Sequence, residues 1–162
     1  VIGAIQGAAV GAGLGLALAC DIRLATPTTQ FLVGAVKVGL SAGECGISYY
    51  LPRLIGAGRA FEIMLTGRPV RGPEAHSIGL ISDIVEPNTL RERAIELARV
   101  IASNAPYSIK HTKQVMWANL ENNFEAALEL ENHVQVVGLL TQDFEEAAKA
   151  FTQKRQPVFT GK

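Results

Sequence analysis

The sequence predicts a mixed α/β (α+β) fold, and two successive patterns along the chain support this prediction. The first part alternates short apolar runs with glycine-rich turns, which is typical of short strands and helices joined by tight connections. After Pro87 the pattern changes to long amphipathic runs. We therefore expect an α/β core over residues 1–86 and a helical tail for packing and oligomerisation over residues 87–162.

The elements follow in order from this pattern. Strands are expected at 1–5, 22–25 and 81–85, with a β-like run at 30–40 that glycines interrupt; helices are expected within 7–20, 41–56, 58–67, 72–80, 87–104, 106–123, 124–140 and 143–156. Ser41 stands three residues before Glu44, the spacing of a capping box at a helix start. Pro52 is expected to limit the helix that follows.

The stretch GAAVGAGLGLALACDIRLAT, residues 7–26, allows three interpretations. A membrane span is disfavoured because glycine and alanine supply little apolar side-chain area. A dinucleotide-binding turn needs the motif G-x-G-x-x-G, with glycine or alanine at its last position. That position is Leu16 when the motif is counted from Gly11 and Leu18 when it is counted from Gly13, so the motif is absent. The third interpretation is a strand, a glycine-rich turn and a helix whose first amide groups face negative charge, which is the chemistry of an oxyanion site.

Composition excludes several classes of function. Fifteen basic and fifteen acidic residues balance to zero, so no nucleic-acid partner is expected, and no membrane partner either. Cys20 and Cys45 are isolated, which favours a reducing, cytoplasmic location and argues against a structural zinc site. The three histidines are scattered, and no metal ligand set is expected.

Three segments resemble the crotonase superfamily, also called the enoyl-CoA hydratase/isomerase family: QGAAVGAGLGLALACDIRLAT, KVGLSAGECGISYYLPRLIG and AFEIMLTGRPVRGPEAHSIGLISDIV. The resemblance runs through all 162 residues and implies repeated ββα units followed by a helical trimerisation region. Family members are about a hundred residues longer at the N-terminus. The chain is therefore expected to be the C-terminal part of such a domain and to need an N-terminal segment for a complete site.

The resemblance also implies an acyl-CoA substrate, whose thioester carbonyl is held by two backbone N–H groups. One donor aligns with Ala12, between Gly11 and Gly13, and the other would lie before Val1. Coenzyme A would enter only as part of the substrate, with no separate cofactor. Ala35 and Gly39 are expected beside the bound substrate.

The positions of the two glutamates used by similar hydratases are occupied by Gly15 and Ala35, neither of which can transfer a proton. Glu44 falls where some isomerase relatives carry an acidic residue. Two roles compete for this carboxylate, as the capping partner of Ser41 or as a group that transfers protons. The leading hypothesis is therefore an acyl-CoA enzyme with isomerase or other enolate chemistry, and the alternative is a non-catalytic acyl-CoA-binding protein.

The end of the chain resembles the family's closing segment. Phe151 and Lys154 align with an aromatic residue and a lysine that reach toward coenzyme A, commonly from a neighbouring subunit. A solvated basic helix end is the alternative interpretation. The family usually forms homotrimers, often paired into hexamers, and the same assembly is expected here.

Overall fold

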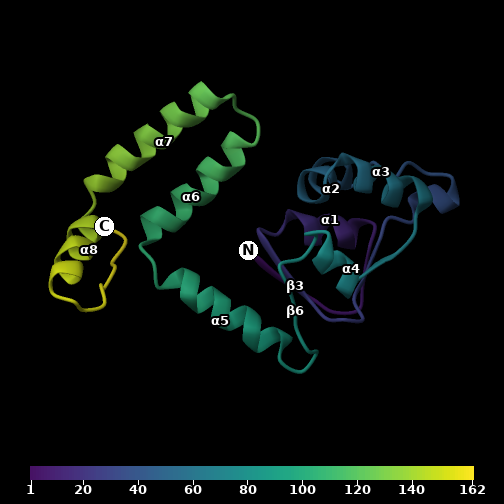
Figure 1. Cartoon of the computed structure of the whole chain (residues 1–162), viewed down its shortest axis with the longest axis horizontal. Coiled ribbons are helices and arrows are strands. Elements are labelled where there is room, and N and C mark those ends of the chain that lie inside the picture. The colour runs from purple at the N-terminus through teal and green to yellow at the C-terminus, as the bar shows by residue number, and fades with distance from the viewer. The chain divides into compact units, whose positions relative to one another are not determined.

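The computed structural model describes residues 1–162 and divides into two compact units, Val1–Glu96 and Leu97–Lys162. Figure 1 shows small strands and short helices in the first unit and longer helices in the second.

The first unit contains two successive β–β–α repeats. β1 (Ile2–Ile5), β2 (Ala8–Val10) and α1 (Ala12–Ala19) form the first repeat; β3 (Ile22–Ala25), β4 (Gln30–Leu32), the 3₁₀ helix η1 (Ala35–Val38) and α2 (Ile47–Ile55) form the second. α3 (Ala57–Thr66), β5 (Val70–Arg71), α4 (Gly72–Ser77) and β6 (Asp83–Ile84) follow. The predicted α/β class and its ββα units are confirmed.

The two repeats place their strands in two separate three-stranded sheets. The first strands pair in parallel in a sheet of order β1-β3-β6, with Ile2 opposite Ile22. The second strands pair in parallel in a sheet of order β2-β4-β5, with Ala8 opposite Gln30, and β5 is antiparallel to β4. The chain of each repeat therefore bends at a corner between its first strand, in one sheet, and its second strand, in the other.

The second corner is fixed by two buried threonines. The Thr29 hydroxyl lies 2.9 Å from that of Thr26 and donates to the Ile5 carbonyl at 2.9 Å. The Gln30 amide donates to the Gly7 carbonyl at 2.9 Å. These bonds tie the corner of the second repeat to that of the first, and both threonines satisfy their polar groups although they are buried.

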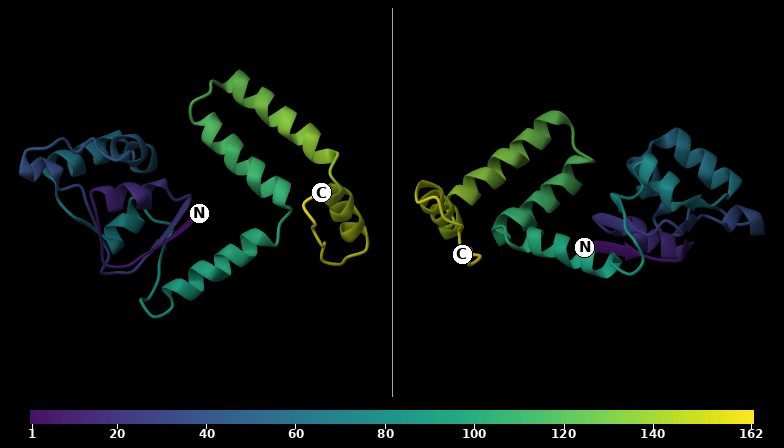
Figure 2. Two further views of the ribbon diagram at one scale, coloured as in Figure 1. Left: turned by 180° about the vertical axis from the view of Figure 1, so that it is seen from behind. Right: turned by 60° about the horizontal axis from the view of Figure 1, so that its bottom comes forward.

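The core of the first unit lies between the sheets and the helices. α2 and α3 lie side by side, and α1 packs against α2 (Figures 1 and 2). The large apolar side chains that are fully buried are Phe31, Leu14, Leu18, Leu24, Ile47, Leu51, Leu80, Val33 and Val70. These residues come from both repeats, from β5 and from the segment after α4, and all except Leu24 belong to one cluster, so the repeats share one core.

Arg23 is a buried residue of β3, and its guanidinium group binds carbonyl groups at the end of α1. Its Nε donates to the Leu80 carbonyl at 2.8 Å, and its Nη1 donates to the carbonyls of Leu18 and Cys20. Burial lowers the pKa of Arg23 from its ordinary value by removing the charge from water. The side chain thus satisfies carbonyl groups that end α1 and joins them to the segment before β6.

Three local predictions are wrong. The β-like run 30–40 ends as a strand at Leu32 and continues as η1, because Gly34 has helical backbone angles. Pro52 lies inside α2, where Ile47, Leu51 and Ile55 are buried on both sides of it and hold the helix by packing.

The capping box is the third error. α2 begins at Ile47, and its N-cap is Gly46 without a side-chain bond. The Ser41 hydroxyl instead accepts a hydrogen bond from the Gly43 amide at 3.1 Å. Ser41 and Glu44 have the spacing of a capping box, but they lie in a loop before α2 and not at the start of a helix.

The predicted succession of four helices after Pro87 is confirmed. α5 (Leu90–Ala102) begins in the first unit and ends in the second, which also contains α6 (Pro106–Asn119), α7 (Phe124–Leu139) and α8 (Gln142–Thr152). α6 and α7 form an antiparallel pair (Figures 1 and 2). None of the helices has the length and apolar character needed to span a bilayer.

The last residues fold back onto α8 through two carboxylates. Asp143 is buried and accepts hydrogen bonds from the amides of Thr160 and Gly161 at 2.7 and 2.9 Å. Glu146 pairs with both Nη atoms of Arg155 at 2.5 and 2.9 Å. This hydrogen-bonded pairing lowers the pKa of Glu146 to about 2, so the contact persists at neutral pH.

Candidate functional site

The predicted oxyanion turn lies between β2 and α1. Gly11 has φ 51°, a left-handed conformation that side chains disfavour, and its amide donates to the Leu32 carbonyl at 3.2 Å. Ala12 is the first residue of α1, so its amide has no acceptor within the helix. Ala12 and Gly13 are both exposed. The turn therefore presents helix N-terminal amides at the surface of the first unit.

Glu44 lies against this turn. A Cβ atom placed on Gly11 would be 3.5 Å from the Glu44 Oε1 atom, so the carboxylate borders the space that a side chain at position 11 would occupy. Glu44 is half-buried, and its carbonyl accepts from the Ile47 amide at 2.8 Å. The structure thus brings Ala12 and Glu44, the two predicted catalytic residues, to one place although 32 residues separate them in sequence.

Gly15 and Ala35 offer no proton-transfer group, and the space around them is occupied. A Cβ on Gly15 would lie 2.4 Å from the Cys45 carbonyl oxygen. Ala35 begins η1 and is 8% exposed, and its carbonyl accepts from the Leu40 amide at 3.0 Å. The first position is therefore closed by backbone, and the second carries a small methyl group packed in the core.

Gly13 and Gly39 differ in their structural reasons for being glycine. A Cβ on Gly13 would meet nothing within 4 Å, although the residue has no positive φ and lies in a helix. Gly39 has φ 78° and ends η1, with its amide donating to the Val36 carbonyl at 3.3 Å. Turn geometry accounts for Gly39, whereas local geometry gives no reason for glycine at position 13.

Phe151 and Lys154 belong to the second unit, at the end of α8. Phe151 is 85% exposed, and its carbonyl accepts from the Lys154 amide at 3.2 Å. Lys154 has φ 53° and terminates the turn that follows the helix. Both side chains are available for contact with a ligand or a neighbouring subunit, and their predicted role with coenzyme A stays a prediction.

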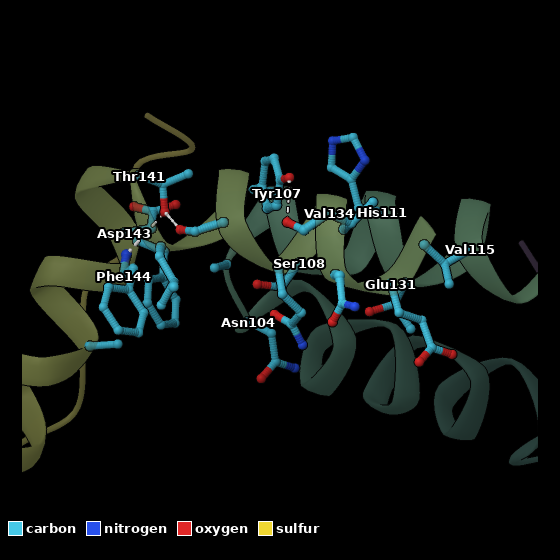
Figure 3. Close-up of a pocket in the computed structure, with 18 of the residues that line it drawn as sticks. Asn104, Tyr107, Ser108, His111, Val115, Glu131, Val134, Thr141, Asp143 and Phe144 are labelled. Atoms are coloured by element: carbon cyan, nitrogen blue, oxygen red, sulfur yellow. Dashed lines mark hydrogen bonds between the residues drawn. The ribbon is translucent and has the colours of Figure 1, made fainter. Parts of the chain in front are cut away.

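The second unit also contains a cavity of about 590 Å³ between α6, α7 and α8. The Tyr107 hydroxyl donates to the Val134 carbonyl at 2.9 Å, and the ring centroids of Tyr107 and His111 are 4.1 Å apart. In Figure 3 His111 and Glu131 point in opposite directions from the helices. The cavity therefore does not pair these two groups for acid–base work.

Sequence reasoning missed the conformation of Cys45, beside the candidate site, and the contacts of Arg23, at the other end of α1. Cys45 has φ 49°, one of two positive values outside glycine, and no sequence pattern around it signals this. Arg23 was placed correctly on a strand, but its three carbonyl partners are distant or lie in the preceding helix. No three His, Cys, Asp or Glu side chains among residues 1–162 lie close enough to hold a metal ion.

Comparison with known proteins identifies the family. The family model described as enoyl-CoA hydratase/isomerase matches residues 1–162. The chain belongs to this family, as the resemblance of its three motifs to crotonases implied.

Relatives in this family carry different activities in their names. The chain is 44% identical to the Mycobacterium tuberculosis protein named probable enoyl-CoA hydratase EchA12, covering 99% of this chain and 57% of that protein. It is 36% identical to 1,2-epoxyphenylacetyl-CoA isomerase of Escherichia coli, covering 100% of this chain and 62% of that protein.

A solved structure gives the same family. The crystal structure of a probable enoyl-CoA hydratase/isomerase from Mycobacterium abscessus superposes with a TM-score of 0.93 at 44% identity, covering 100% of this chain and 62% of that one. The chain thus spans about three fifths of the length of the relatives it matches.

Proposed function

We propose that this chain supplies part of the active site of an acyl-CoA enzyme that isomerises a double bond through a thioester enolate. The Ala12 amide would donate to the thioester oxygen, and Glu44 would transfer the proton. The single observation that supports this most is the position of the Glu44 carboxylate, 3.5 Å from where a Cβ on Gly11 would lie, next to Ala12.

The proposed reaction moves one proton between two carbons. Glu44 removes a proton from the carbon between the thioester and the double bond, and the electron pair enters the thioester as an enolate. The Ala12 N–H, at the positive end of α1, stabilises the oxygen charge that develops. The carboxyl group then returns the proton at the far carbon of the former double bond, which moves the double bond into conjugation.

Hydration is disfavoured in this proposal because it requires a second polar group to orient a water molecule. Gly15 and Ala35 cannot do so, and Cys45 backbone atoms fill the space beside Gly15. Loss of one oxyanion donor typically costs about 3 kcal/mol of transition-state stabilisation, so the enolate step depends strongly on the Ala12 turn.

The first prediction concerns Glu44. A carboxylate base typically contributes a factor of about 10² to 10⁴, so Glu44→Gln should lower isomerisation by that order in the full-length protein. Acyl-CoA affinity should remain nearly unchanged because glutamine keeps the shape of the side chain. Proton NMR of a 3-enoyl-CoA in deuterated water measures isomerisation, deuterium uptake and hydration together.

Glu92→Gln is the matched control, since Glu92 is exposed in the first turn of α5 and outside the site. It should leave turnover unchanged. Equal isomerisation and deuterium uptake in wild type and Glu44→Gln would contradict the proposal and favour the alternative of a non-catalytic acyl-CoA binder. Hydration faster than isomerisation in the wild type would contradict the isomerase preference.

The remaining expectations belong to this same proposal. The substrate is an acyl-CoA, with coenzyme A present only as part of the substrate. The enzyme works in the cytoplasm as a homotrimer or hexamer, and Phe151 and Lys154 contact the coenzyme. A second N–H donor from outside residues 1–162 completes the oxyanion site.

A further inference from the structure

The closest backbone approach at the candidate site joins α1 to the segment before α2. A Cβ on Gly15 would lie 2.4 Å from the Cys45 carbonyl oxygen, 3.0 Å from its Cβ and 3.3 Å from its carbonyl carbon. Two of these three atoms are backbone, which cannot rotate aside as a flexible side chain can. Any side chain at position 15 therefore forces the Cys45 segment to move.

The Cys45 segment has a defined shape. Cys45 and Gly46 have φ 49° and 78°, and the Ile47 amide donates to the Glu44 carbonyl at 2.8 Å. Two positive φ values within such a bond are the features of a type I′ turn. We call residues Glu44–Ile47 the Glu44 turn. It rests on Gly15 at one point and leads directly into α2.

The position of the turn decides the position of its first side chain. The Glu44 carboxylate reaches Gly11, four residues before Gly15 on the same segment of chain. A turn displaced away from Gly15 would carry the Glu44 backbone away from the Ala12 amide. Proton transfer is sensitive to such shifts, since misplacement by about 1 Å can cost about 100-fold in rate.

We propose that Gly15 is a positioning residue that admits the Glu44 turn against α1 and thereby places the Glu44 carboxylate beside Ala12. This inference rests on the proposed function of Glu44. It adds that a carboxylate at position 15 and the Glu44 turn exclude each other, because both need the same space. One glycine thus selects which carboxylate the site uses.

The central variant is Gly15→Ala in the full-length protein, with Gly58→Ala as the matched control. Gly58 also lies in a helix, and a Cβ there would meet nothing within 4 Å. Gly15→Ala should speed amide hydrogen exchange of residues 44–47 and lower the isomerisation kcat about 10- to 100-fold. The acyl-CoA Kd should stay within about threefold, and Gly58→Ala should change none of these.

A double-mutant cycle separates positioning from a general structural role. If Gly15 acts through Glu44, Gly15→Ala should slow the wild type but not slow Glu44→Gln further. Equal slowing in both backgrounds, or unchanged exchange and kcat in Gly15→Ala, would overturn the inference. Full turnover by Glu44→Gln would overturn the proposed function itself, whereas slow Glu44→Gln beside fast Gly15→Ala overturns only the positioning role.

Cys45→Val is a second variant that perturbs the Glu44 turn, for use if Gly15→Ala fails to fold. Cys45 is exposed, and a β-branched residue strongly disfavours its positive φ. The same faster exchange and lower kcat are expected, and unchanged values would overturn the inference. Gly15→Glu should gain no hydration activity; hydration gained while exchange at residues 44–47 stays slow would show that the two carboxylate positions do not exclude each other.

Discussion

Arg23 shows how one buried charge can hold a β–β–α repeat together. Its guanidinium group reaches the carbonyls of Leu18 and Cys20 at the end of α1 and that of Leu80 before β6. Hydrogen bonds from a charged donor contribute more than neutral ones, and a buried acceptor that loses its donor keeps the full desolvation cost. The residue therefore contributes to stability through polar contacts inside an otherwise apolar unit.

The second prediction, after that for Glu44, concerns this residue. Arg23→Met keeps the approximate length of the side chain but removes all three hydrogen bonds, so it should lower the free energy of unfolding by about 2–4 kcal/mol. Urea denaturation of the full-length protein measures the loss. Arg23→Lys should be intermediate, because one ammonium group lacks the planar fork that reaches three carbonyls. A change below about 0.5 kcal/mol in Arg23→Met would contradict this role.

Glu44 and Gly15 meet at the same turn, where Cys45 packs on Gly15. Sequence spacing alone left Glu44 between a cap and a catalytic role, and the structure removes the cap by placing the start of α2 at Ile47. Position 15 could be recognised as lacking a carboxylate from the sequence. The close approach of Cys45 could not, because it joins residues 30 positions apart through their backbones.

Among the elements, α1 forms a helix although it contains two glycines, which have a low helix propensity. Gly13 and Gly15 each cost about 1 kcal/mol relative to alanine in a helix interior. Burial of Leu14 and Leu18 offsets this cost, because both side chains are almost fully enclosed in the core. Gly15 has a packing reason, whereas the space over Gly13 is open within the unit.

Gly13→Ala should therefore raise the free energy of unfolding by about 0.5–1 kcal/mol, measured by urea denaturation. The same change should weaken acyl-CoA binding if a thioester occupies the open space, measured by calorimetry. A stabilised variant with unchanged acyl-CoA affinity would separate Gly13 from the binding site. A destabilised one would show that this position is packed in the full-length protein.

Elements with a strong pattern could be predicted, and elements defined by distant partners could not. The strand 22–25 and the helix after Gly11 follow from local apolar runs and glycine punctuation, and both lie where expected. β2 and β5 are three and two residues long, so only their pairing with β4 defines them. Pro52 misled because packing on both sides of it outweighs the lost hydrogen bond.

At the scale of the whole molecule, the second unit leaves large apolar side chains uncovered. Phe151, Leu140 and Phe124 are 85%, 83% and 79% exposed. Exposed side chains of this size mark contact surfaces when they gather, and the predicted trimer would cover such surfaces on the helical tail.

The full-length protein should therefore sediment as a trimer or a dimer of trimers at micromolar concentration. Leu140→Glu should shift it toward smaller species, because a charge at a buried contact costs more than a leucine contributes. Glu129→Gln on α7, the helix that ends just before Leu140, serves as a control that adds no charge and should leave the assembly unchanged. A wild-type monomer in this experiment would contradict the predicted assembly.

The two sheets have one further consequence for handling the protein. β1 and β2 stand at the ends of their sheets, so each pairs on one side and offers a free row of backbone donors and acceptors on the other. Such edges recruit other strands, whether from a further repeat of the same kind or from a second molecule. Preparations in which nothing covers these edges should therefore be more prone to aggregate by strand pairing than preparations in which they are covered.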